Sequence, residues 1–187
     1  MPFLSAIQAA AMGFKSLGEN VLISDRAAIY GAERMEIGDN VRIDDFTVIS
    51  GKVVIGCNVH VSVFCNVAGG TAGVTLDDFS GLSPGCQVFS ESDDYSGNAL
   101  TNPTVPSEFR RETRAAVTLG RHCIVGAGSM VLPGVSLAEG CSVGAMSMVA
   151  RSTEPWGVYA GVPARRIKER SRDLLLLEDA YLRTTKG

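Results

Sequence analysis

The chain has 187 residues, of which 45% are hydrophobic and 20% charged, and its net charge is −3. The length and the hydrophobic fraction are sufficient for the core of one folded domain and exclude a largely disordered chain. The negative net charge argues against nucleic acid as the main partner. No apolar run approaches the roughly 20 residues that cross a bilayer. The apolar stretch 3–12 lacks the cationic start of a secretory signal, so we expect a cytoplasmic protein without a membrane span.

The first predicted element is a short helix over residues 2–17, inside an N-terminal helical cap that we place at 1–20. The region that follows, 21–160, is predicted to be a repeat domain. A cap is expected at its start, because a stack of repeats otherwise ends on an uncovered apolar face.

The repeat has a period of six residues. Each six-residue unit, or hexad, has an aliphatic residue at its first position and a small or β-branched residue at its fifth. A period of six fits neither an α-helix nor a meander of hairpins and indicates a solenoid. If three hexads close one coil, residues about 18 apart stack in register. The aliphatic first positions are Ile37, Ile43, Ile49, Ile55, Val61, Val67, Leu76, Leu82, Val88, Leu119, Val125, Val131, Leu137, Val143 and Val149.

Four of the five cysteines occupy the small fifth position of a hexad. Cysteine in such a position behaves as a small hydrophobic residue, and the chain has no C-x-x-C spacing typical of a metal site. We therefore interpret Cys65, Cys86, Cys123 and Cys141 as core residues and predict no metal. Cys57 stands at a third position and is expected to face outward.

The repeat is interrupted between Val88 and Leu119, and we place an extruded loop at about 89–118. A gap of about thirty residues is longer than a turn needs and is usually functional. After the repeat we expect a C-terminal helix within 161–187, from Pro163 through Arg183, because proline is favoured in the first turn of a helix.

The hexads, the extruded loop and the closing run 159–164 (YAGVPA) together resemble the hexapeptide-repeat acyltransferases, in particular the branch that acetylates sugars. The resemblance implies an all-β solenoid, a left-handed parallel β-helix with an extruded loop and short N- and C-terminal helices. It also implies a homotrimer, with acetyl-CoA in the groove between neighbouring coils. The implied acceptor is a sugar, and the loop favours a nucleotide-linked amino-dideoxy sugar used in surface polysaccharide such as lipopolysaccharide.

Small and basic residues near the end of the repeat are the candidates for the CoA site. Outward Gly and Ala in 125–129 and 143–147 are expected to leave main-chain amides open to those of pantetheine, although they also suit a tight turn. Nearby arginines are expected to neutralise the CoA phosphates, with a merely solvated surface as the alternative. The candidate cofactor-binding residues are Ala127, Gly128, Ala145, Arg151, Ala160, Arg165 and Arg166.

Acyl transfer to an amine or hydroxyl calls for a proton acceptor, and the chain has two histidines. His60 is predicted to point outward near a coil corner and is the first candidate base; His122, also expected to face outward, is the second. Galactoside and maltose acetyltransferases have a histidine at the start of the loop, where this chain has 90–97 (SESDDYSG). A loop carboxylate, Asp93 or Asp94, as the base therefore stays open, as does an amine acceptor that enters partly deprotonated.

The loop also supplies candidate acceptor-binding residues. Carboxylates and amides there suit sugar hydroxyls or a cationic amine, although the same residues form Asx turns in ordinary loops. Loop arginines suit the phosphates of a nucleotide-linked sugar, or serve only solubility. The candidate acceptor-binding residues are Asp93, Asp94, Tyr95, Asn98 and Asn102, and the loop arginines are Arg110, Arg111 and Arg114.

Other functions fit the same repeat. An O-acetyltransferase of free sugars or antibiotics shares the fold and the donor, and a non-catalytic structural solenoid would not bind acyl-CoA. A γ-carbonic anhydrase is excluded, because it needs three histidines for its metal and the chain has two. The sequence leaves open the acceptor, the choice between amine and hydroxyl, and the length of the acyl chain.

Overall fold

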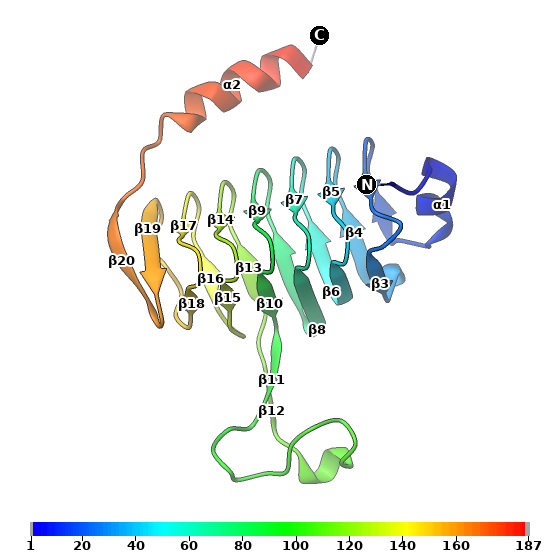
Figure 1. The fold of residues 1–187 in the computed structure, drawn as a ribbon, viewed down its shortest axis with the longest axis vertical. Coiled ribbons are helices and arrows are strands. Elements are labelled where there is room, and N and C mark those ends of the chain that lie inside the picture. Colours follow the sequence, from blue (N-terminus) through cyan, green and yellow to red (C-terminus); the bar gives the residue numbers. More distant parts are fainter. Residues whose placement is uncertain (1, 186–187) are drawn as a thin grey trace.

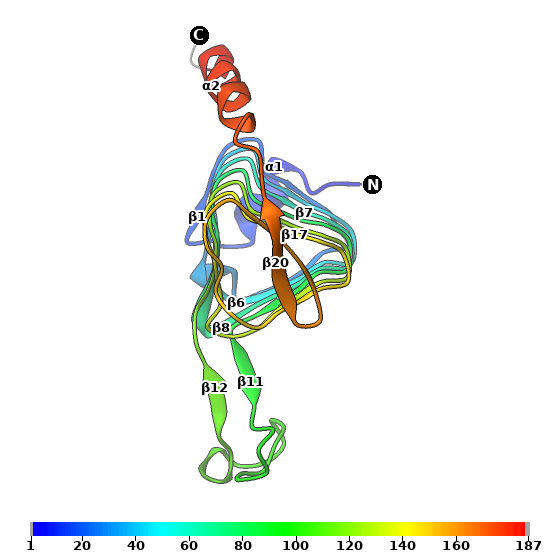
Figure 2. The same cartoon turned by 90° about the vertical axis from the view of Figure 1, so that its left-hand side faces the viewer.

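The computed structural model describes residues 2–185. Met1, Lys186 and Gly187, which the expected terminal caps include, lie outside the described residues. Short parallel strands wind into a three-sided prism, a left-handed parallel β-helix, seen from the side in Figure 1 and along the stack of coils in Figure 2. The predicted fold class is confirmed, and the coil has the opposite hand to most parallel crossovers.

The prism is built from two sheets in the described chain. One has eight strands: β2 (Leu22–Ile23), β5 (Arg42–Ile43), β7 (His60–Val61), β9 (Gly81–Leu82), β14 (Ile124–Val125), β17 (Ser142–Val143), β19 (Gly157–Gly161) and β20 (Ala164–Glu169). The other has ten and bends around a corner: β1 (Ser16–Leu17), β3 (Ala28–Tyr30), β4 (Met35–Ile37), β6 (Val48–Ile55), β8 (Asn66–Leu76), β10 (Gln87–Phe89), β13 (Val117–Leu119), β15 (Met130–Val131), β16 (Ser136–Leu137) and β18 (Met148–Val149).

Each coil stacks on the next in the predicted register. Ile43 pairs with Val61, and Val125 pairs with Val143, so in these coils each residue lies beside the one 18 positions further on. Insertions lengthen the spacing elsewhere, as between Leu82 and Val125. All the aliphatic first positions are at most 3% exposed and form one continuous interior column. The four cysteines predicted to be core residues are also buried, whereas Cys57 is half-buried and its Sγ accepts a hydrogen bond from the Asp39 N–H at 3.3 Å.

One corner of the prism is lined by residues with left-handed backbone conformation. The first coils use asparagine, which adopts a positive φ easily; the later coils use one glycine and three bulky ring residues, for which a positive φ is less common. Ring stacking between coils offsets the cost of the left-handed conformation. The Phe79 and His122 rings lie 5.3 Å apart. The Trp156 ring covers Gly140, and a Cβ at Gly140 would lie 2.4 Å from that ring. The residues of this corner are Asn20, Asn40, Asn58, Phe79, His122, Gly140 and Trp156.

The terminal helices are shorter than predicted. The helix α1 spans Ala6–Ala11, with Ser5 and Gln8 forming a capping box, and residues 16–17 already belong to β1. The expected helix from Pro163 is wrong over its first half, because Ala164–Glu169 form β20, which runs antiparallel to β19 and covers the open edge of the last coil. The helix α2 begins only at Leu174 and ends at Thr185.

An extruded arm, residues 90–116, leaves the prism after β10 and returns at β13. Its stem is the antiparallel pair β11 (Glu91–Asp93) and β12 (Glu112–Arg114), and a 3₁₀ turn, η2 (Ser107–Phe109), lies near its tip. A second 3₁₀ turn, η1 (Ala32–Arg34), precedes β4. The arm and α2 project from opposite sides of the prism (Figures 1 and 2). Among residues 2–185, no helix combines the length and apolarity that crossing a membrane requires.

Removing the hydroxyl of Ser80 is expected to stabilise the fold. Ser80 is 3% exposed and stacks in the interior between Val59 and Cys123, and within the described chain its Oγ has no hydrogen-bond partner. A buried polar group without a partner costs about 1–3 kcal/mol, so Ser80→Ala should raise the free energy of unfolding by about 1 kcal/mol in a urea titration.

Ser129→Ala is the matched control for this prediction. Ser129 is equally buried, but its Oγ donates to the Gly144 carbonyl at 2.9 Å and accepts the Ser147 N–H at 3.1 Å. Its replacement should lower the free energy of unfolding, because the two partners are left unpaired. Equal destabilisation by both variants would contradict the assignment of Ser80 as an unpaired buried hydroxyl.

Candidate active site

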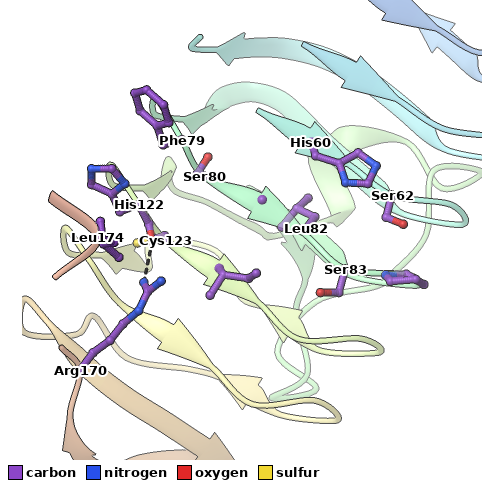
Figure 3. Close-up of a pocket in the computed structure, with 13 residues that line it drawn as sticks. His60, Ser62, Phe79, Ser80, Leu82, Ser83, His122, Cys123, Arg170 and Leu174 are labelled. Carbon is purple, nitrogen blue, oxygen red and sulfur yellow. Dashed lines mark hydrogen bonds between the residues drawn. The ribbon is translucent and has the colours of Figure 1, made fainter. Parts of the chain in front are cut away.

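A cavity of about 440 Å³ opens on the outer face of the eight-stranded sheet. We call it the β9 hollow, because β9 forms its floor with β7 and β14 on either side. Figure 3 shows His60, Ser62 and Ser83 on one side of it, and Phe79, His122 and Leu174 on the other. It is lined by His60, Ser62, Phe79, Ser80, Gly81, Leu82, Ser83, Pro84, His122, Cys123, Ile124, Arg170 and Leu174.

His60 lies at the edge of the hollow with half of its side chain exposed, and a buried carboxylate holds it there. The Asp44 side chain, 5% exposed, places Oδ2 2.8 Å from His60 Nε2, and its Oδ1 accepts a hydrogen bond from Arg42 Nε at 2.7 Å. Asp44 is not among the site residues predicted from the sequence. The signal for it is the spacing of 16 residues, which in an 18-residue coil places position 44 beside position 60.

The charge state of Asp44 fixes the orientation of the imidazole. Burial acts to raise the pKa of the Asp44 carboxyl, but the hydrogen bonds from Arg42 and His60, together with the positive charge of Arg42, outweigh it and hold the pKa below its usual value. An ionised carboxylate only accepts hydrogen bonds, so the hydrogen of a neutral His60 ring lies on Nε2. The lone pair of Nδ1 is then the group that can accept a proton.

His122 points away from the interior column, as predicted, but α2 covers it and the imidazole is buried. Its side chain is 6% exposed, its ring stacks on Phe79, and its Nε2 lies 2.9 Å from Oε2 of Glu178 in α2. Burial lowers the pKa of His122, and the positive charge of Arg121 lowers it further. The left-handed conformation at this corner turns the ring beneath α2, and the sequence pattern contains no signal for that contact.

The helix α2 is held over this corner by contacts from several coils. Glu178 pairs with both His122 and Arg121, and the Tyr181 hydroxyl donates to Asn58 Oδ1 at 2.9 Å. Just before the helix, Arg170 donates to the carbonyl oxygens of residues 122 and 140 at 2.7 and 3.0 Å. These contacts make the start of α2 one wall of the β9 hollow.

The polar arm residues that the sequence singled out organise the arm itself. The Asp94 carboxylate accepts hydrogen bonds from the Ser96 hydroxyl and from the N–H groups of residues 96, 98 and 99, at 2.9–3.2 Å. These hydrogen bonds lower the pKa of Asp94, and the one from the Ser96 hydroxyl has the largest effect. Asp93 accepts the Asn102 N–H at 3.3 Å, and the Asn98 side chain donates to Ser96 at 2.7 Å. Tyr95, by contrast, is 92% exposed.

Within one chain, the arm and the hollow do not meet. The arm projects from the side of the prism opposite to α2, whose first turn borders the β9 hollow (Figure 1). His60 and the arm residues Asp93, Asp94, Tyr95, Asn98 and Asn102 are therefore not brought together by a single copy.

The candidate CoA residues fall in two places at the C-terminal end. Gly128 and Ala145 lie exposed in the corner turns of adjacent coils, with Ala127 beside them. The expectation that the main chain there is open is wrong in part: Gly128 N–H donates to the Pro84 carbonyl, and Met146 N–H to that of Ala127. Among the described residues, the amide N–H groups of Ala127 and Ala145 have no main-chain partner.

The candidate phosphate-binding arginines lie at the last coils. Ala160 on β19 pairs with Arg165 on β20, and Arg166 follows it on the same strand. Arg166 is already paired with Glu154 at 3.5 Å and with Glu169 at 2.5 Å, whereas Arg151 and Arg165 are exposed. In residues 2–185, no group of three or more His, Cys, Asp or Glu side chains is arranged to hold a metal.

A left-handed β-helix with an extruded arm and an outer hollow beside a carboxylate-held histidine defines a hexapeptide-repeat acyltransferase. The chain is 44% identical over 184 residues to dTDP-4-amino-4,6-dideoxy-D-glucose acyltransferase of Escherichia coli, covering 97% of this chain and 95% of the relative. It is 43% identical to AntD, an N-acyltransferase from Bacillus cereus solved with dTDP and 3-hydroxybutyryl-CoA, with a TM-score of 0.97 over 99% of this chain and 98% of that one. The chain belongs to the hexapeptide-repeat family of sugar acyltransferases.

More distant comparisons agree on the fold. GDP-perosamine N-acetyl transferase from Caulobacter crescentus is 20% identical to this chain, with a TM-score of 0.60. The match covers 87% of this chain and 62% of that chain, and it shows a shared fold alone. No protein-family model matches the chain.

Proposed function

We propose that the protein transfers the acyl group of acyl-CoA, acetyl in the first instance, to the amino group of a dTDP-linked 4-amino-4,6-dideoxy sugar. The observation that carries this proposal is the similarity, over nearly the whole of both chains, to an N-acyltransferase solved with a nucleotide and an acyl-CoA together. A relative with 44% identity has the same activity in its name.

The β9 hollow supplies a proton acceptor for this reaction. The acceptor nitrogen attacks the thioester carbonyl carbon, and its proton goes to Nδ1 of His60, which Asp44 orients. The carbon–nitrogen bond forms, the carbon–sulfur bond breaks, and the departing thiolate takes the proton from His60. Ser62 and Ser83, on the same side of the hollow as His60, are suited to donate a hydrogen bond to the oxyanion that forms between these steps.

The CoA donor is proposed to lie along the corner formed by Ala127 and Ala145. Their N–H groups, which have no main-chain partner in the described chain, suit the amide oxygens of pantetheine, and the small side chains let it approach the backbone. Arg151 and Arg165, together with Arg166, then lie at the end of the groove where phosphates are neutralised. Gly128 and Ala160 are also small, so we propose that they let CoA approach the backbone closely at the two ends of this path.

The site is proposed to be completed by a neighbouring copy in a homotrimer. The arm leaves the prism on the side opposite to α2 (Figure 2), whose first residue, Leu174, lines the hollow, so we propose that the arm serves the hollow of a neighbouring copy. The helix α2 leaves Leu176 and Leu177 each 72% exposed, which is typical of a surface that packs against another chain.

The arm also carries a second cavity of about 550 Å³, which we propose receives the acceptor's diphosphate. Arg110 and Arg114 line it and are both paired with Glu112, whereas Arg111 is exposed. Three guanidinium groups and one carboxylate line the cavity, so its net charge is positive and favours an anion.

The proposed substrates suggest where the enzyme works. Acyl-CoA and nucleotide sugars carry several phosphate charges, and such ions do not cross a bilayer unaided. We therefore propose a cytoplasmic enzyme whose product is later used in a surface polysaccharide such as lipopolysaccharide.

The test is transfer from labelled acetyl-CoA to a panel of acceptors: dTDP-4-amino-4,6-dideoxyglucose, its 4-hydroxy counterpart, the free amino sugar and chloramphenicol. We expect product only from the dTDP-linked amine. Product from the 4-hydroxy counterpart or from chloramphenicol would favour the alternative O-acetyltransferase, a class whose chloramphenicol acetyltransferase from Klebsiella aerogenes matches 32% of this chain at 36% identity. Product from the free amino sugar would contradict the requirement for the nucleotide. Absence of both transfer and CoA binding would favour a structural solenoid.

Asp94→Ala is expected to raise the KM for the acceptor roughly tenfold and to lower kcat less, because the carboxylate holds the shape of the arm rather than acting as the base. Steady-state kinetics with both substrates varied measure this, and the KM for acetyl-CoA should stay unchanged. Glu108→Ala, also on the arm and exposed, is the control and should be neutral. A hundredfold fall in kcat at unchanged KM would instead make Asp94 a catalytic residue.

A further inference from the structure

A glycine forms the floor of the β9 hollow. Gly81 pairs in register with His60 on one neighbouring coil and with Ile124 on the other, and all three positions face outward from the sheet. His60 and Ile124 carry half-exposed side chains. The hollow exists at this point because the position between them has no side chain.

The fold does not require glycine at this position. Gly81 does not have the left-handed conformation that favours glycine, and a Cβ built on it would meet only the His60 carbonyl oxygen, at 3.6 Å, an ordinary contact. By contrast, a Cβ on Gly126 would lie 2.5 Å from Ala145 N, and one on Gly140 2.4 Å from the Trp156 ring. Neither backbone conformation nor packing therefore requires glycine at position 81, and the space above it is open.

The chemistry of the floor indicates which kind of ligand fits this space. The Gly81 N–H already donates to the Cys123 carbonyl at 2.9 Å in the coil-to-coil ladder, so this amide offers space and no hydrogen-bond donor. Ile124, Pro84 and Leu174 give the hollow apolar walls beside the floor. An alkyl group fits such a surface, whereas a sugar ring would leave hydroxyls unpaired there.

We propose that Gly81 is a specificity-determining residue: the space left by its missing side chain receives the acyl group of the thioester and sets the longest acyl chain that is transferred. This inference rests on the proposed function. It places the acyl carbons next to His60, so the carbonyl carbon of the thioester comes within reach of the attacking amine.

Gly81→Ala and Gly81→Val test this proposal. The alanine variant should fold normally, because its added Cβ would make no contact closer than 3.6 Å. In Gly81→Ala, kcat/KM for butyryl-CoA relative to acetyl-CoA should fall at least about tenfold, the usual effect of one methylene in a tight apolar pocket. Gly81→Val should reduce acetyl transfer as well. The Kd of CoA itself, which has no acyl group, should be unchanged by calorimetry, as should the KM for the acceptor.

Ser142→Val is the matched control. Ser142 lies in the same outward column, one coil beyond Ile124, and does not line the hollow, so its bulkier variant should keep the wild-type ratio. An unchanged butyryl-to-acetyl ratio in Gly81→Ala overturns the proposal, and a raised acceptor KM alone would place the acceptor's methyl group there instead. If the wild-type protein acylates no amino sugar, the proposed function fails, whatever the Gly81 variants show.

Discussion

His60→Ala is expected to lower kcat by a factor of about 10²–10⁴, the usual contribution of a positioned general base. The KM for acetyl-CoA should change little, because His60 lies on β7, away from the corner turns at Ala127 and Ala145 along which CoA is proposed to bind. Steady-state kinetics measure both values, and thermal melting checks that the variant is folded. An unchanged kcat would exclude His60 and favour an amine that enters deprotonated.

The same mechanism makes Asp44 a positioning residue. Asp44→Asn keeps an oxygen next to His60 Nε2 but removes the charge that fixes the tautomer, so kcat should fall in the same direction by a smaller factor. In the His60→Ala background the Asn substitution should have no further effect, which a merely structural role would not predict. Asp45→Asn is the control, because Asp45 pairs with Ser24 and Arg26 and not with His60.

The second large effect is on folding. Val125→Asp is expected to abolish the folded state, because Val125 is fully buried between Leu82 and Val143 of the neighbouring coils. An unpaired carboxylate there costs several kcal/mol, a large part of the 5–15 kcal/mol by which domains are typically stable. Circular dichroism and size-exclusion chromatography of the expressed variant measure the outcome.

Ile124→Asp is the matched control for this variant. Its position is adjacent in the chain but 44% exposed on the outer face, so a charge there remains hydrated. It should fold with a thermal midpoint near that of the wild type. A Val125→Asp protein as stable as Ile124→Asp would mean that the interior column has been assigned to the wrong residues.

The sequence by itself determined the coil and its interior. The aliphatic positions from Ile37 to Val149 and the four fifth-position cysteines were all predicted to be buried, and all are. This was possible because a solenoid repeats one contact: each residue packs against those a fixed number of positions away, so the period alone reveals the neighbours. The family resemblance then added the hand of the coil, which periodicity does not encode.

Only the tertiary structure decided which polar residues meet. His122 and Glu178 are 56 residues apart, and their contact depends on where α2 lies. The strand β20 also depends on a tertiary partner: residues 164–169 form a strand because they pair with β19 at the open edge of the last coil. The spacing of Asp44 and His60 places them on adjacent coils, but only the folded chain shows that their side chains meet and that Gly81 lies between the outward side chains of His60 and Ile124. These contacts follow from how distant segments pack in space, and a six-residue period describes only the contacts that every coil repeats.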